Sequence, residues 1–307
     1  MDYLGNLIEK IENLKRRRNA VILAHNYQLP EVQDIADYVG DSLELAKKAM
    51  NVDADVVVLA GVYFMAETAA ILNPDKIVLI PDPSAGCPLA SFLTIDTIRR
   101  YREKYPRAPL VIYINSYAMA KYYADYIVTS ASALKLVGKL DENEIIFGPD
   151  RNLASYVAEV TGKNVIPIPL GGYCSVHEFL VSEYYVRKAI QEHPNAKLLI
   201  HPEAPPEARK LAHFVGSTSQ MIRAIGELGG NEFLLGTEEG LVYRARKMYP
   251  NKRIYPVNPR AICINMKKIT LKNIVEALDK MKFIVRVDDN IAKKVRETLQ
   301  LSFEMVK

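Results

Sequence analysis

The stretch ILAHNYQLPEVQDIADYVGDSLELAKKA, residues 22–49, decides the fold, because two later stretches follow the same pattern. LVIYINSYAMAKYYADYIVTSASALKLVG begins at residue 110, and LLIHPEAPPEARKLAHFVGSTSQMIRAIG begins at residue 198. Both offsets are 88 residues, and polar positions recur as well as apolar ones. A period of this length is typical of a domain repeated three times rather than of a short-repeat solenoid.

Four columns of chemically active side chains recur in the three copies. They are His25, Tyr113 and His201; Tyr27, Asn115 and Glu203; Ser42, Ser130 and Thr218; and Cys87, Cys174 and Cys263. The last column is spaced by 87 and 89 residues and contains all three cysteines of the chain. Four columns at nearly one offset indicate a true repeat rather than a chance alignment.

Each copy predicts the same order of strands and helices. An apolar run, such as residues 110–114, is followed by an amphipathic helix, a short apolar run and a second helix that opens on Ser or Thr. A strong strand, a third helix and a last strand then lead to the cysteine. Strands that alternate with helices favour a parallel sheet covered on both faces. The expected fold is three homologous doubly wound α/β/α domains with parallel sheets around a pseudo-threefold axis.

The repeat also sets the expected domain boundaries. The first α/β unit spans residues 1–87 and is completed by 264–307, the second spans 88–174, and the third spans 175–263. A helix over 3–17 and the helical segment from 270 onward lie outside the repeat. Their apolar stripes predict terminal helices that pack on the first unit.

Composition excludes several classes of protein. Of 307 residues, 49% are hydrophobic and 25% are charged, as in ordinary globular proteins. A net charge of +4, with one basic run at residues 15–18 that suits a helix end, does not indicate a nucleic-acid partner. The apolar runs are too short for a membrane helix, and the N-terminus lacks the pattern of a leader peptide. We therefore expect a cytoplasmic protein that binds neither nucleic acid nor membrane.

The three cysteines predict a metal centre. They cannot all pair with one another, and the single CxxH motif, formed by Cys174 and His177, has no second pair. Ligands gather at the carboxyl ends of parallel strands, where each cysteine is expected. Three thiolates suit a [4Fe–4S] cluster with one open iron, or a catalytic zinc with an open fourth position. The alternative for each cysteine is a small buried apolar side chain.

The remaining columns predict anion binding and proton transfer. Hydroxyls before helices are ordinary N-caps, yet a helix N-terminus also binds carboxylate or phosphate, and Gly40 and Gly216 would allow close approach. Histidine, tyrosine and glutamate side chains near an open Lewis acid can move protons. Glu203 is the expected general base, with a pKa raised by a cavity that it shares with thiolates.

The dispersed motifs together resemble the quinolinate synthase family. They are residues 22–49, DPSAGCPLA, YINSYAMAK, VTSASALK, GYCSVHEF, HPE, GSTSQMI and NMKKITL, which cover about residues 20–275 in the family's order. The resemblance implies three homologous domains around one [4Fe–4S] cluster per chain, held by Cys87, Cys174 and Cys263. It resembles the short form of the family, because Cys263 has no CxxC partner.

The resemblance also implies a reaction and roles for single residues. Iminoaspartate, supplied by an aspartate oxidase or dehydrogenase, would condense with dihydroxyacetone phosphate to quinolinate on the route to NAD, with release of phosphate and water. The catalytic residues would be His25, Tyr27, Tyr113, His201 and Glu203, of which His25 and Tyr27 would transfer protons and Glu203 would be the base. Carboxylates and phosphate would be held by Tyr113, Asn115, Ser42, Ser130, Ser217 and Thr218, together with His25, His201 and Glu203. His177 and Lys267 are secondary candidates.

Two other functions remain open from the residues alone. A non-catalytic iron–sulfur protein could sense oxidation on the same scaffold, although it would not need the acid–base set. A zinc-dependent phosphosugar enzyme would also use three converging thiolates.

Overall fold

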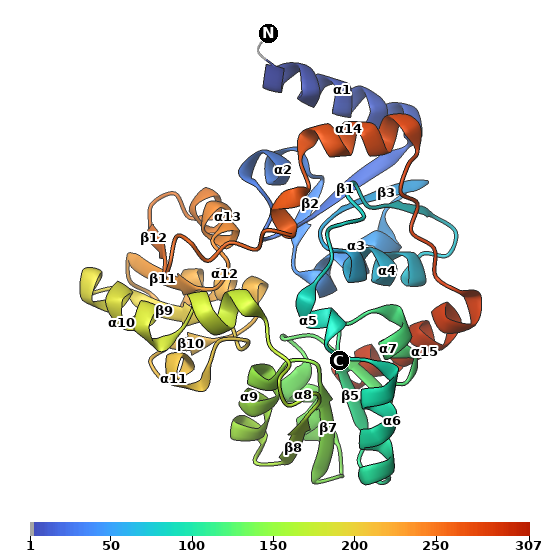
Figure 1. Ribbon diagram of the computed structural model, residues 1–307. Helices are drawn as coiled ribbons and strands as arrows, with labels where there is room; N and C mark the ends of the chain where they lie inside the picture. Colours follow the sequence, from blue (N-terminus) through green and yellow to red (C-terminus); the bar gives the residue numbers. More distant parts are fainter. Residues whose placement is uncertain (1–2) are drawn as a thin grey trace. The chain divides into compact units, whose positions relative to one another are not determined.

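Three four-stranded sheets, all parallel, form the framework of the protein. The structure is a computed structural model that describes residues 3–307 (Figure 1). In spatial order the sheets are β2 (Tyr38–Gly40), β1 (Ala20–His25), β3 (Val56–Ala60) and β4 (Ile77–Leu79); β6 (Tyr126–Val128), β5 (Leu110–Tyr113), β7 (Glu144–Gly148) and β8 (Asn164–Pro167); and β10 (Phe214–Val215), β9 (Lys197–Ile200), β11 (Glu232–Gly236) and β12 (Arg253–Pro256). The strand order is the same in each, which confirms the predicted α/β fold with three parallel sheets.

The same hydrogen bonds recur in each sheet. In each copy of the repeat, the residue just before the second strand has a side chain that accepts a backbone N–H from the first strand, 15 positions earlier in the chain. The three bonds are Asp37 Oδ2 from Ile22 (2.7 Å), Asp125 Oδ2 from Leu110 (2.7 Å) and His213 Nδ1 from Leu198 (3.0 Å). These bonds bring the second strand beside the first. The repeat therefore extends to the way in which each sheet is assembled.

The chain divides into two compact units. Unit 1 contains the residues up to Cys87 together with Cys263–Arg296, and unit 2 contains Pro88–Ile262 with Glu297–Lys307. Unit 1 holds the first sheet, and unit 2 holds the other two. Helix α15 (Asp289–Met305) contributes residues to both units. The three domain boundaries expected from the repeat, and the pseudo-threefold axis, stay predictions.

Unit 1 is built around a sheet with helices on its faces. Its helices are α1 (Tyr3–Arg18), α2 (Pro30–Ile35), α3 (Ser42–Asn51), α4 (Tyr63–Leu72), a 3₁₀ turn η2 (Met266–Lys268) and α14 (Leu271–Lys280). Figure 1 shows α14, in red, beside α1, in blue. Buried Leu14 and Ile274 join one apolar core with Ile22 and Val58 of the sheet. Helices α1 and α14 therefore pack on the first sheet, whereas the end of the chain, expected on the same unit, belongs to unit 2 from Glu297 onward.

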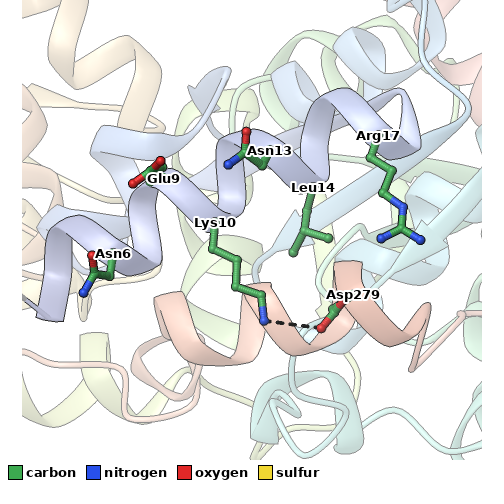
Figure 2. A pocket seen from close by; sticks show the side chains of 7 residues that line it. All are labelled: Asn6, Glu9, Lys10, Asn13, Leu14, Arg17 and Asp279. Atoms are coloured by element: carbon green, nitrogen blue, oxygen red, sulfur yellow. Dashed lines mark hydrogen bonds and ion pairs between the residues drawn. The ribbon is translucent and has the colours of Figure 1, made fainter.

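A shallow groove lies along the surface where α1 and α14 meet. It is lined by Asn6, Glu9, Lys10, Asn13, Leu14, Arg17 and Asp279, as Figure 2 shows. Lys10 Nζ lies 3.3 Å from Asp279 Oδ2, and both side chains are largely exposed. Such a solvated ion pair stabilises little. None of the predicted site residues lines this groove.

Unit 2 contains two sheets and most of the helices. Its helical segments are α5 (Pro88–Ser91), α6 (Ile95–Lys104), α7 (Ala118–Tyr122), α8 (Ala133–Lys139), α9 (Arg151–Thr161), the π-helical turn η1 (Val176–Leu180), α10 (Glu183–Glu192), α11 (Pro206–Arg209), α12 (Thr218–Glu227) and α13 (Gly240–Met248). In the two sheets of unit 2, the inner strands β5 and β9 are almost wholly buried, as expected for parallel strands covered on both faces. Ser302 of the C-terminal segment accepts the N–H of Ile127 in β6 (2.9 Å). Among the described residues, no helix is both long enough and apolar enough to span a membrane.

Candidate active site

Glu203 is the centre of a buried cluster of polar side chains in unit 2. It follows β9, and only 3% of its surface is exposed. Tyr113, which ends β5, donates a 2.6 Å hydrogen bond to Glu203 Oε1, and the Asn115 amide donates a second at 3.2 Å. His177 Nδ1 lies 3.0 Å from the other oxygen, Oε2. The carboxyl ends of the first strands of two sheets therefore meet, which brings together four of the predicted site residues: Tyr113, Asn115, His201 and Glu203.

Two histidines lie against each other beside this carboxylate. The rings of His177 and His201 stack with centroids 4.8 Å apart and an interplanar angle of 28°. His201 Nδ1 accepts the backbone N–H of Glu203 (3.3 Å), so the proton of a neutral His201 ring is on Nε2. Burial lowers the pKa of His201 from 6.5 to about 3, against the opposing effect of Glu203. His201 is therefore a neutral hydrogen-bond donor at physiological pH.

A second buried carboxyl group, Asp150, lies near Glu203. It follows β7 and caps α9, where Oδ1 accepts the N–H of Leu153 (2.7 Å). Oδ2 accepts the backbone N–H of Cys174 (3.1 Å). Burial, and then the charge of Glu203, raise the pKa of Asp150 well above its ordinary value. Asp150 thus holds both the start of a helix and the loop that carries a predicted metal ligand.

The pKa of Glu203 moves in the opposite direction to that of Asp150. Burial would raise the pKa, but the attraction and hydrogen bond of His177, the field of His201 and the hydrogen bond from Tyr113 hold it below its ordinary value. The expectation of a raised pKa for Glu203 was therefore wrong, because its partners outweigh its burial. Two neighbouring carboxyl groups with pKa values pushed apart are a common arrangement for acid and base roles.

The backbone on either side of Glu203 is held by Asn152 and Arg209. The Asn152 amide donates to the Glu203 carbonyl (2.9 Å) and to Glu178 Oε2 (2.8 Å). The buried Arg209 guanidinium donates to the carbonyls of Ala204 (2.7 Å) and Asn152 (3.0 Å). These bonds fix the loop whose side chain is the expected base.

Unit 1 repeats part of this geometry. His25 is 6% exposed, and its Nδ1 accepts the N–H of Tyr27 (3.2 Å), as His201 accepts that of Glu203. The two rings meet edge to face, with centroids 4.5 Å apart. Lys267 Nζ donates to the carbonyl of Tyr27 (2.8 Å), which gives this secondary candidate a role in holding the loop. A neutral His25 also carries its proton on Nε2.

None of the three hydroxyl residues Ser42, Ser130 and Thr218 is the residue that caps its helix. Helix α12 begins with a capping box in which Ser217 Oγ accepts from Gln220 N and Gln220 Oε1 accepts from Ser217 N. At α3 the equivalent bonds are made by Asp41 with Glu44. Ser42 and Thr218 are thus the first residues of their helices rather than the caps. Ser130 lies in the turn before α8.

Each cysteine is a half-buried thiol in the loop after the last strand of a sheet. Cys87 and Cys263 belong to unit 1, whereas Cys174 belongs to unit 2. One ligand atom each of Cys174, His177 and Glu203 lie within 4.8 Å of one another. The site in unit 2 therefore combines a thiol with the acid–base cluster.

Four residues of this site were missed from the sequence: Asp150, Asn152, Arg209 and Thr237. The hydroxyl of Thr237 lies 3.0 Å from His177 Nε2. The repeat held a signal for one of them, because Asp150 is 88 positions before Glu238. Glu238 is likewise buried after its strand, and it accepts the N–H of Gly240 (2.8 Å). A carboxylate therefore recurs at this position in the second and third copies, whereas the first copy has Val62 there.

Parallel sheets with a buried acid–base cluster at their strand ends define an α/β enzyme. The family described as Quinolinate synthetase A protein matches residues 9–304. This chain belongs to that family, which confirms the resemblance seen in its motifs.

Relatives of similar length match nearly the whole chain. It is 54% identical to the quinolinate synthase of Pyrococcus horikoshii, over 98% of this chain and 100% of that protein. It is 54% identical to the quinolinate synthase of Thermococcus kodakarensis, over 97% of this chain and 98% of that protein. The quinolinate synthase of Thermotoga maritima is 46% identical, over 98% and 100%.

Proposed function

We propose that this protein is a quinolinate synthase that condenses iminoaspartate with dihydroxyacetone phosphate to quinolinate, with loss of phosphate and water, in NAD biosynthesis. Family membership over residues 9–304 supports the activity. The structural observation that carries the proposal is the buried Glu203 carboxylate, held by Tyr113, Asn115 and His177. Condensation and dehydration both require a base and donors shielded from water.

The donor set fits an iron–sulfur cluster. Cys87, Cys174 and Cys263 are thiols in equivalent loops of the three repeats, and each is partly exposed rather than packed as an apolar side chain. We assign them as ligands of one [4Fe–4S] cluster, which leaves one iron without a protein ligand. When bound, the cluster would supply a Lewis acid for loss of hydroxide. Asp150 would fix the loop of Cys174 through its backbone N–H.

Side chains around Glu203 would move the protons. The ionised Glu203 accepts a proton from a carbon next to the imine or carbonyl group, and Tyr113 donates the hydrogen bond that orients its carboxylate. His201, neutral with its proton on Nε2, donates to a substrate oxygen. His25 and Tyr27 would serve the triose-derived part of the substrate in the same way, since His25 has the same local geometry.

Helix starts would hold the anionic groups. Ser42 and Thr218 are the first residues of α3 and α12, where the direction of the backbone N–H groups and the helix dipole favour carboxylate and phosphate. Asn115, Ser130 and Ser217 would add donors. Because iminoaspartate hydrolyses readily, we propose supply by an aspartate oxidase or dehydrogenase in the cytoplasm.

The test is anaerobic incubation of the cluster-reconstituted protein with both substrates. Quinolinate is expected, measured by chromatography against a standard. A brown protein that binds four iron and four sulfide ions but forms no quinolinate would favour a redox sensor. An active, colourless protein with bound zinc would favour the zinc enzyme, which the family match does not support.

A further inference from the structure

We propose that the protein without its cluster binds one divalent transition-metal ion, such as Zn²⁺ or Co²⁺, through Cys174, His177 and Glu203. One donor atom of each residue lies within 4.8 Å of the others. A tetrahedral ion with bonds of about 2.0–2.3 Å holds its ligand atoms about 3.3–3.8 Å apart. His177 Nδ1 and Glu203 Oε2 are already 3.0 Å apart, so the thiol of Cys174 is the donor that needs to draw in, by roughly 1 Å. All three lie in unit 2, so this site is independent of Cys87 and Cys263.

The chemistry of the donors selects the class of metal. A thiolate, an imidazole and a carboxylate together suit zinc and cobalt, whereas magnesium and calcium prefer oxygen alone. A thiolate and a carboxylate also balance the charge of a divalent ion, which matters because His177 and Glu203 are only 2% and 3% exposed. Three protein ligands leave a fourth position for water.

Neighbouring side chains already orient two of the ligands. His177 Nε2 lies 3.0 Å from Thr237 Oγ1, which leaves Nδ1 to face Glu203 Oε2. With metal on Nδ1, the ring proton is on Nε2 and donates to the Thr237 hydroxyl. Glu203 Oε1 is held by Tyr113, so Oε2 is the oxygen that turns to the metal. Such supporting hydrogen bonds are typical of metal sites and strengthen binding.

A cobalt titration of the full-length, iron-free protein under reducing conditions tests the site. One equivalent of Co²⁺ should produce a thiolate-to-cobalt charge-transfer band, which Zn²⁺ displaces. The band should disappear in Cys174→Ser, and affinity should fall at least tenfold in His177→Gln and Glu203→Gln. Thr237→Val, which keeps all three ligands, should weaken binding by about tenfold.

Cys87→Ser and Cys263→Ser are the matched controls, and both should keep the band and the affinity of the unmodified chain. Loss of the band in all three cysteine variants would show a three-cysteine site and overturn the proposal. An affinity unchanged in His177→Gln and Glu203→Gln, or no cobalt binding at all, would also overturn it. Circular dichroism identifies any variant that does not fold, and Thr237→Val then carries the test.

Occupancy of this site would compete with the proposed function, because the ion takes one proposed cluster ligand and the proposed base. Protein loaded with zinc should therefore assemble its cluster at least tenfold more slowly than the metal-free protein. An equal rate of assembly would show that the two do not compete and would overturn this consequence. The cobalt titration requires no turnover, so its outcome and that of the activity test are independent.

Discussion

The phenol of Tyr113 donates a 2.6 Å hydrogen bond to Oε1 of Glu203, although the two residues are 90 positions apart in the chain. Each lies where the first strand of its sheet ends, one in the second copy of the repeat and one in the third. A bond between equivalent edges of two sheets therefore joins a proton donor to the proposed base.

Replacement of the base should abolish turnover and preserve the fold. Glu203→Gln keeps the shape of the side chain but removes the carboxylate, so kcat should fall by about 10²–10⁴. Quinolinate formation by reconstituted protein measures the loss, and iron content should not change. Glu207→Gln, an exposed residue of α11 near the same loop, is the control and should keep full activity. Equal activity of Glu203→Gln and the unmodified chain would remove Glu203 from the mechanism.

Loss of the Tyr113 hydroxyl should raise the pKa of Glu203. Its hydrogen bond stabilises the ionised carboxylate, so Tyr113→Phe makes the protonated form easier to reach. Titration of the ¹³C-labelled Glu203 carboxyl by NMR measures the change, with Glu203→Gln to assign the signal. Tyr126→Phe, in the neighbouring strand β6, should leave this titration unchanged. A pKa that does not rise would show that the phenol does not stabilise the charge.

Replacement of Arg209 should lower both stability and kcat. Arg209→Met leaves the carbonyls of Ala204 and Asn152 buried without this donor, at a cost of about 1–3 kcal/mol in the free energy of unfolding. Because the loop of Glu203 is then less firmly placed, kcat should fall more than KM changes. Glu159→Gln, which removes only the half-exposed ionic partner of Arg209, should cost less than about 1 kcal/mol. Thermal unfolding measures the loss of stability, and steady-state kinetics measure the fall in kcat. An unchanged kcat in a folded Arg209→Met variant would contradict the predicted role of Arg209 in placing the loop.

Stability should fall as the pH decreases from 6.5 toward 3. The pKa of His201 is about 3 in the folded protein and 6.5 as an ordinary value, so the unfolded chain binds more protons within this window. Unfolding is then favoured by acid, at up to about 1.4 kcal/mol per pH unit for one such group. In His201→Gln the melting temperature should depend less steeply on pH than in the unmodified chain. Thr237 also lies beside His177, and Thr237→Val should keep the pH dependence of the unmodified chain. Identical slopes in His201→Gln and the unmodified chain would contradict this account.

The fold could be predicted because its signals are local and occur three times. Each strand and each cysteine is marked in every copy, and the offset of 88 aligns Tyr113 with His201 and Asn115 with Glu203. Because these positions follow the first strand in each copy, the side chains were expected at the carboxyl ends of parallel strands, where ligands bind. The division into two compact units has no such signal, because it depends on packing between distant segments.

The support of the site was hidden for a physical reason. Asn152 and Arg209 act on backbone carbonyls, and a carbonyl is the same at every position, so no residue pattern reveals which one is held. The lowered pKa of Glu203 depends on His177, which contacts the carboxylate from a π-helical turn. The spacing of apolar residues in the sequence does not predict such a turn. The direction of the pKa shift of Glu203 can therefore be predicted only when its contacts are known.

A repeated scaffold offers a symmetric set of corresponding places, and groups of different chemistry at those places can divide acid and base roles between them. In unit 2 that symmetry is broken: where one copy has the phenol of Tyr113, the next has the imidazole of His201, and an amide corresponds to a carboxylate. Three copies of one framework thus present different functional groups at matched positions.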